Sequence, residues 1–116
     1  MSLESTGTHL IIDLYEIEDN EILKYVDDLI PILDKIVDKY ELNVVARASH
    51  QFSPFGATIV YVLSESHLSI HTFVEERKIA MDLYTCSSFK DADEIPKYIT
   101  SLFNDKCKIR YKIIER

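Results

Sequence analysis

The pattern that most constrains the fold is a set of six short β-prone segments interrupted by two segments of helical periodicity. Residues 20–40 and 91–104 carry apolar side chains at spacings of three and four, which is typical of amphipathic helices. Segments rich in β-branched and aromatic residues predict strands at 8–17, 42–50, 57–63, 67–73, 79–86 and 107–114. The simplest fold for this β-α-β-β-β-β-α-β order is an α+β two-layer sandwich, a mostly antiparallel sheet with both helices on one face.

Local features predict further detail within these segments. Pro31 falls inside the first helical segment, and we expect a kink or a restart there because proline removes a hydrogen bond. Asp91 and Glu94 resemble a capping box, and Pro96 comes early enough in the second helix to be tolerated. The nearly continuous apolar run at 57–63 predicts a strand that is buried on both faces.

The composition indicates one ordinary globular domain. The chain has 116 residues, 47% of them hydrophobic, which suits a single core. Its net charge of −7 disfavours nucleic acid, because phosphate binding needs clustered Lys and Arg. No apolar run approaches the roughly 20 residues of a membrane helix, and the N-terminus lacks the features of a signal peptide. Two cysteines are too few for a disulfide scaffold, which favours the reducing environment of the cytoplasm. Together these features predict a cytoplasmic protein without membrane or nucleic-acid partners.

Reactive side chains are concentrated in the segment SESHLSIHTF, residues 64–73. Ser66 is a candidate nucleophile, and His67 and His71 are candidate bases. The alternation along 67–73 predicts His67 and His71 on one face of the strand and Leu68 and Ile70 on the other. At about 3.3 Å per residue the two histidines lie about 13 Å apart, so no shared metal site is predicted. There is no G-x-S-x-G elbow. On these residues alone, an exposed polar strand face with Cys86 as a small core residue remains open beside nucleophilic catalysis.

Residues 64–86 closely resemble the core of the prokaryotic S-adenosylmethionine decarboxylase proenzymes. The shared features are a Glu-Ser-His-Leu-Ser-Ile-His-Thr run at 65–72 and an Asp-Leu-Tyr-Thr-Cys ending at 82–86. Upstream, the residues His-Gln-Phe-Ser-Pro-Phe-Gly at 50–56 are similar to the family's His-x-Phe-x-Pro-x-Gly loop. The similarity covers nearly the whole chain in length and element order.

The resemblance implies that the chain cleaves itself. Cleavage of the Glu65–Ser66 bond would give a chain of residues 1–65 and a chain of residues 66–116. Ser66 would become a pyruvoyl group, the cofactor that binds substrate as a Schiff base. His71 matches the histidine that accepts the α-proton during this processing.

The resemblance also implies roles outside the cleavage site. Cys86 matches the catalytic proton donor, and Thr58 stands where the family has a serine that supports processing. Phe52 and Glu75 match the residues that stack on adenine and bind the ribose hydroxyls. The family's active sites lie at a dimer interface, which implies a homodimer of cleaved protomers. This fits the small size of the domain.

The resemblance leaves the substrate to be decided among related activities. The first hypothesis is decarboxylation of S-adenosylmethionine for spermidine synthesis. The family commonly has Trp-Pro where this chain has Phe73 and Val74, and relatives that decarboxylate arginine share the fold and the self-cleavage chemistry. The alternatives are therefore a pyruvoyl-dependent arginine or ornithine decarboxylase, or a non-catalytic α/β binding module.

Overall fold

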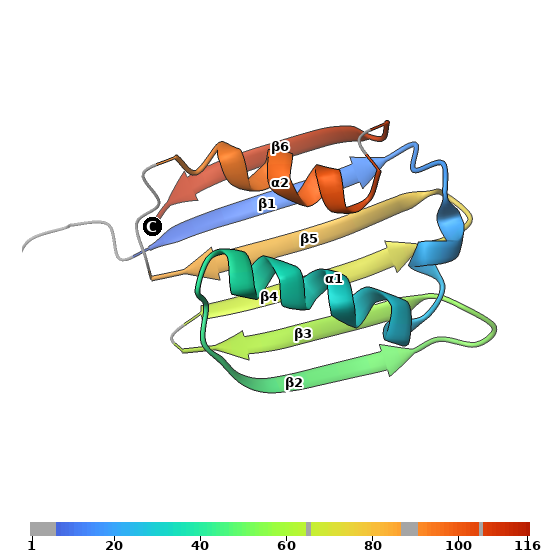
Figure 1. Cartoon of the computed structure of the whole chain (residues 1–116), viewed down its shortest axis with the longest axis horizontal. Helices are drawn as coiled ribbons and strands as arrows, with labels where there is room; N and C mark the ends of the chain where they lie inside the picture. The colour runs from blue at the N-terminus through green and yellow to red at the C-terminus, as the bar shows by residue number, and fades with distance from the viewer. Residues whose placement is uncertain (1–6, 65, 87–90, 105) are drawn as a thin grey trace, which may run out of the picture.

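The computed structural model describes residues 7–64, 66–86, 91–104 and 106–116. Within these ranges, six strands form one sheet in the order β2-β3-β4-β5-β1-β6, and all five neighbouring pairs are antiparallel (Figure 1). The bounds of the strands are β1 Thr8–Tyr15, β2 Val44–Gln51, β3 Ala57–Leu63, β4 Ser66–Phe73, β5 Lys78–Thr85 and β6 Lys108–Glu115. The helical elements are the 3-10 turn η1 Asn20–Leu23 and the helices α1 Val26–Lys39 and α2 Glu94–Leu102.

Both α-helices lie on one face of the sheet, so the predicted α+β two-layer sandwich is confirmed. Figure 1 shows α1 in front of the middle strands and α2 in front of β1 and β6. The core fills the space between the layers, and each fully buried Leu or Ile contributes about 1.5–3 kcal/mol through the hydrophobic effect. Its fully buried side chains include Leu10, Ile12, Leu14, Ile59, Leu68, Ile70, Ile79 and Leu83 from the strands and Leu29, Leu33, Ile36, Ile95 and Ile99 from the helices.

The first helical segment is interrupted between Leu23 and Val26, not at Pro31. The prediction of a restart at Pro31 is therefore wrong. The 3-10 turn η1 ends at Leu23, α1 begins at Val26, and α1 continues through Pro31. The restart is fixed by a tertiary contact, because the backbone N–H of Val26 donates to the side-chain oxygen of Gln51 at 2.7 Å. The sequence around the proline carries no signal of that contact.

The predicted capping box of the second helix is also wrong. Helix α2 starts at Glu94, its N-cap is Asp93, and no side chain caps it. The backbone N–H of Glu94 donates to the carbonyl oxygen of Asp91 instead of a side-chain oxygen. The Asp93 carboxylate accepts a hydrogen bond from the Tyr111 hydroxyl of β6 at 3.0 Å, so the sheet takes up the group that could have capped the helix. Pro96 is accommodated in the first turn, as predicted.

One face of the sheet is not covered by the helices, and we call it the open face. Along β3, Ile59 and Tyr61 are buried against the helices, whereas Val62 on the other side is 43% exposed. The prediction that 57–63 is buried on both faces is therefore wrong for the single chain, because its second layer covers only one side. Side chains that alternate with the core along the strands form the open face; they include Ile11, Val60, Val62, His67, Ser69, His71, Ala80, Asp82 and Tyr84.

Candidate active site

The predicted site residues fall into two groups at opposite ends of β4. Ser66 is the first residue of this strand, and His71 lies five residues further on. At about 3.3 Å per residue this separation is about 16 Å, too far for one side chain to act on the other. The alternation predicted for the strand is confirmed, since Leu68 and Ile70 are buried in the core while His71 is exposed on the open face.

The first group, the cleavage end, consists of Ser66 and Cys86. Strands β4 and β5 are antiparallel with His67 opposite Tyr84, so the start of β4 and the end of β5 lie at the same end of these two central strands. Cys86 follows the last residue of β5 and is exposed. The structure therefore brings Ser66 and Cys86 to one end of the sheet, as expected for residues that act on the same molecule.

The turn before Ser66 is tied to the segment that precedes β2. The Ser66 hydroxyl donates to the carbonyl oxygen of Ser64 at 3.2 Å. Asn43 holds Ser64 through two contacts, a backbone hydrogen bond of 3.0 Å to its N–H and a side-chain hydrogen bond of 2.8 Å to its hydroxyl. Glu65 lies outside the described residues. The position of Ser66 directly after a tethered turn suits a hydroxyl that must reach the carbonyl of the residue before it.

The second group, the pocket end, surrounds a cavity of about 460 Å³ at the other end of β4. The Thr58 hydroxyl and His71 Nδ1 are hydrogen-bonded at 3.0 Å across the pair β3–β4. Phe52, 48% exposed, presents an aromatic ring to the cavity, and Glu75 supplies a carboxylate. The residues that line the cavity are Phe52, Phe55, Gly56, Thr58, His71, Thr72, Phe73, Val74, Glu75 and Glu76.

Sequence reasoning missed two contributors to the pocket end. Phe55 lines the cavity from the same loop as Phe52, and the repeated aromatic residue in that loop was the available signal. Glu76 adds a second carboxylate beside Glu75, and nothing in the sequence distinguished it from an ordinary charged turn. An aromatic wall with two carboxylates can bind a flat ring and a cationic or hydroxyl-bearing ligand.

A polar cluster lies on the open face near the cleavage end. His9 Nε2 and Asp82 Oδ1 are 3.1 Å apart, and the ring of His9 lies within about 6 Å of two other rings, at 6.1 Å from His67 and 5.8 Å from Tyr84. Among the described residues, no three His, Cys, Asp or Glu side chains are grouped so that they could hold a metal ion. No helix in the described part of the chain is long and apolar enough to cross a membrane.

This arrangement defines an α+β protein with serine and cysteine side chains at one end of its sheet and an aromatic, acidic pocket at the other end. Comparison with known proteins identifies the family to which the chain belongs. The family model described as S-adenosylmethionine decarboxylase matches residues 8–116.

Individual relatives agree with the family model. A protein from Sulfurihydrogenibium sp. named S-adenosylmethionine decarboxylase proenzyme is 37% identical over 113 residues, which cover 97% of this chain and 84% of the relative. A protein of the same name from Persephonella marina is 36% identical with the same coverage. The crystal structure of the adenosylmethionine decarboxylase from Aquifex aeolicus superposes with a TM-score of 0.86 at 33% identity, covering 97% of this chain and 92% of that one. The chain belongs to the S-adenosylmethionine decarboxylase family.

Proposed function

We propose that this protein is a self-processing, pyruvoyl-dependent decarboxylase that converts S-adenosylmethionine to its decarboxylated aminopropyl-donor form for spermidine synthesis in the cytoplasm. The observation that carries the proposal is the convergence of Phe52, Thr58, His71 and Glu75 on one pocket, in a chain that belongs to this family. These residues come from the β2–β3 loop, from two strands and from the turn after β4. Each stands at the position that the resemblance assigns to substrate binding or processing.

Self-cleavage would begin at Ser66. Its hydroxyl attacks the carbonyl of Glu65, and the peptide bond becomes an ester. A base removes the Ser66 α-proton, and the carboxylate of residues 1–65 leaves. The dehydroalanine that remains tautomerises, and water hydrolyses it to the pyruvoyl ketone with release of ammonia. An imidazole suits the role of base because it accepts protons near neutral pH. His71 is the proposed base, and Thr58 orients its ring through the hydrogen bond to Nδ1.

The distance between the two ends of β4 favours a site shared between two copies of the chain. Within one chain Ser66 and His71 are about 16 Å apart. Consider two copies that stack through their open faces, with a two-fold axis that runs between the sheets and across the strands at the middle of β4. This axis would place each end of β4 opposite the other end of β4 in the partner. Stacked sheets lie about 10 Å apart with interdigitating side chains, so the start of β4 in one copy, where the chain would be cleaved, would lie opposite His71 of the partner subunit.

The chemistry of the open face supports this homodimer. This face carries the small and apolar side chains of Ile11, Val60, Val62 and Ala80 from three of its strands. Two of them, Ile11 and Val62, are 37% and 43% exposed in the single chain. An isologous interface uses the same patch on both partners, as a two-fold axis through this face requires. The homodimer is thus part of the proposed function, since each site is incomplete without the second chain.

The residues at the cleavage end fit the proposed cofactor. A pyruvoyl group supplies a ketone that condenses with the substrate amine and takes up the electrons left when CO₂ departs. Ser66, its source, lies at the start of β4, and the exposed Cys86 lies at the same end of the sheet. A thiol is mostly protonated at neutral pH, so Cys86 is the proposed donor of a proton to the former α-carbon.

The pocket end would recognise the nucleoside part of the substrate. Phe52 offers a flat face to adenine, and Glu75 can accept hydrogen bonds from two ribose hydroxyls. A sulfonium is a cation that the faces of Phe73 and Phe55 attract. The paired carboxylates of Glu75 and Glu76 also suit a guanidinium or ammonium group, which is the specific feature that keeps arginine and ornithine as second candidates.

The substrate is tested by comparing CO₂ release from S-adenosylmethionine, arginine and ornithine by the purified, cleaved protein. We expect S-adenosylmethionine to be turned over with the highest kcat/KM, because only this substrate offers an adenine ring to Phe52. Preferential release from arginine or ornithine would contradict the substrate and leave the pyruvoyl chemistry standing. An uncleaved chain that releases no CO₂ from any of the three would instead favour a binding module.

Substitutions at the pocket end are expected to raise KM for S-adenosylmethionine without affecting self-cleavage. Stacking on one base is worth roughly 1–3 kcal/mol, so Phe52→Ala should raise KM by about 5–150-fold. Glu75→Gln should raise KM as well, because the amide keeps the size of the side chain but loses its charge. Steady-state kinetics and intact mass measure both effects.

Tyr111→Ala is the matched control for Phe52→Ala. Tyr111 is 40% exposed, belongs to β6 and does not line the cavity. The substitution Tyr111→Ala removes an exposed aromatic ring of similar size, and we expect the KM for S-adenosylmethionine to stay unchanged. An unchanged KM for Phe52→Ala, or a similar rise for Tyr111→Ala, would contradict the assignment of the nucleoside to this pocket.

A further inference from the structure

Gln51, the last residue of β2, connects three segments through its side chain. Its Oε1 accepts a hydrogen bond from the backbone N–H of Val26 at 2.7 Å. Its Nε2 donates toward three backbone carbonyl oxygens, those of Lys24 at 2.9 Å, Gly56 at 3.0 Å and Phe52 at 3.1 Å. One carboxamide therefore joins the start of α1, the end of the turn η1 and both ends of the loop that lines the pocket.

The carboxamide of Gln51 provides a hydrogen-bond partner at the start of α1 that the neighbouring side chains do not provide. The N–H groups of the first turn of a helix have no partner within the helix, and the N-cap Tyr25 provides no side-chain hydrogen bond. Gln51 supplies the acceptor for Val26, and both of its N–H donors are used on the three carbonyls. An apolar side chain at this position would leave these backbone groups without that partner.

The loop from Phe52 to Gly56 is fixed to the same junction by its backbone. The N–H of Phe52 donates to the carbonyl oxygen of Gly56 at 2.8 Å, which closes the loop. The N–H of Gly56 donates to the carbonyl oxygen of Lys24 at 2.7 Å. Gly56 has φ +108°, a backbone conformation that residues with a side chain rarely adopt. The closed shape of the loop therefore depends on glycine at this position.

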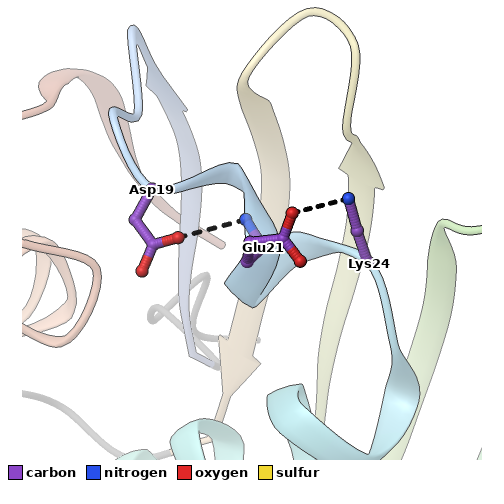
Figure 2. A network of polar contacts seen from close by, with 3 residues as sticks. All are labelled: Asp19, Glu21 and Lys24. Atoms are coloured by element: carbon purple, nitrogen blue, oxygen red, sulfur yellow. Dashed lines mark hydrogen bonds and ion pairs between the residues drawn. The ribbon is translucent and has the colours of Figure 1, made fainter.

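Lys24, which receives these contacts, is itself held in place (Figure 2). The Asp19 carboxylate accepts a hydrogen bond from the backbone N–H of Glu21 at 3.1 Å, and the Glu21 carboxylate pairs with Lys24 Nζ at 2.6 Å. This hydrogen bond to Glu21 raises the pKa of Lys24 above its usual value, which keeps the ammonium charged. The same ammonium lies 5.4 Å from the ring centre of Phe55, a second aromatic residue of the pocket.

We propose that Gln51 is a positioning residue for the substrate, which holds the 52–56 loop against the η1–α1 junction so that the rings of Phe52 and Phe55 are preset to receive a flat aromatic group. The inference rests on the proposed function, in which that group is the adenine of S-adenosylmethionine. Because a fixed loop loses less conformational freedom when substrate binds, the contribution of Gln51 is to substrate affinity. Gln51 is exposed, lies opposite the buried Ala57 in the β2–β3 pair and so is on the side of the sheet that the helices cover, and it does not line the cavity.

Two substitutions remove the donors of the carboxamide, and one of them keeps an acceptor. Gln51→Met removes all four hydrogen bonds at similar size. Gln51→Glu retains an acceptor for Val26 but loses the donors to the three loop and junction carbonyls. We expect each to raise KM for S-adenosylmethionine by about tenfold with unchanged kcat and unchanged self-cleavage, since an affinity loss of this size corresponds to the net strength of about one hydrogen bond.

A double-mutant cycle with Phe52 distinguishes positioning from general destabilisation. If Gln51 acts through the rings of the loop, Gln51→Met should raise KM by a smaller factor in a Phe52→Ala background than in the unsubstituted protein, because only its effect through Phe55 remains. Hydrogen exchange gives a readout that needs no substrate, and the amide of Gly56 should exchange faster in Gln51→Met than in the unsubstituted protein. Thr100→Val removes one hydrogen bond within α2, far from the loop, and serves as the control that should change neither quantity.

The proposal is overturned by an unchanged KM in both Gln51 variants, by additive effects in the cycle, or by unchanged exchange at Gly56. Failure of the proposed function is seen separately, as absence of CO₂ release by the unsubstituted protein. In that case the exchange measurement still decides whether Gln51 holds the loop, and a protected Gly56 amide in Gln51→Met overturns the proposal by itself.

Discussion

Ser66→Ala is expected to leave the chain whole and without decarboxylase activity. Alanine has no hydroxyl to attack the preceding carbonyl, so neither the ester nor the pyruvoyl group can form. The unsubstituted protein should separate on denaturing electrophoresis into two fragments. Intact mass should assign them to residues 1–65 and 66–116, the second lighter by one ammonia than a peptide that starts with serine. A whole chain with full activity would refute the pyruvoyl hypothesis.

Ser69→Ala is the control for this experiment. Ser69 lies on the same strand, three residues after Ser66, but its side chain belongs to the open face and is almost fully buried among its neighbours. We expect this variant to cleave at the same bond as the unsubstituted protein. Loss of cleavage in Ser69→Ala as well would show that the Ser66 result reflects damage to the strand and not loss of the nucleophile.

Co-expression of a Ser66→Ala chain with a His71→Ala chain is expected to restore cleavage that neither chain shows alone. In a mixed dimer one of the two shared sites contains Ser66 of the His71→Ala chain together with the intact His71 of the partner subunit. That chain should be cleaved, whereas the Ser66→Ala chain stays whole. With equal, random pairing, about half of the His71→Ala chains are in mixed dimers and should be cleaved. Differently tagged chains and intact mass measure this fraction.

The pair Ser66→Ala and Cys86→Ala is the matched control, because both residues lie at the cleavage end of one chain. In a mixed dimer of these two chains, each site lacks either the serine or the cysteine. The Cys86→Ala chain should still cleave itself, but we expect no recovery of CO₂ release. Recovery in this pair, or its absence in the Ser66 and His71 pair, would contradict the arrangement in which each site joins opposite ends of β4.

Local sequence patterns predicted the order of helices and strands and the alternation of side chains along β4. The strand predicted at 57–63 has the same bounds in the structure, and the alternation in β4 separates Leu68 and Ile70 from His71 as expected. Such patterns succeed because successive side chains of a strand point to opposite faces whatever the rest of the chain does. The two-layer arrangement follows, since each amphipathic helix must cover an apolar sheet face.

Contacts between distant segments could not be predicted in this way. The restart at Val26 depends on Gln51, 25 residues further on, and Asp93 is engaged by Tyr111 instead of capping α2. Each of these polar groups has several possible partners within a few residues, and packing of the sheet against the helices selects a distant one.

For the candidate site, the sequence by itself determined which residues are present, through the Glu-Ser-His run and the His-x-Phe-x-Pro-x-Gly loop. Only the tertiary structure decided how they are grouped. The antiparallel register places Ser66 and Cys86 at the same end of the sheet, and the β3–β4 pairing places Thr58 beside His71 toward the other end of β4. The physical reason is the rise of an extended chain: residues five apart in a strand are neighbours in the sequence but lie about 16 Å apart in space.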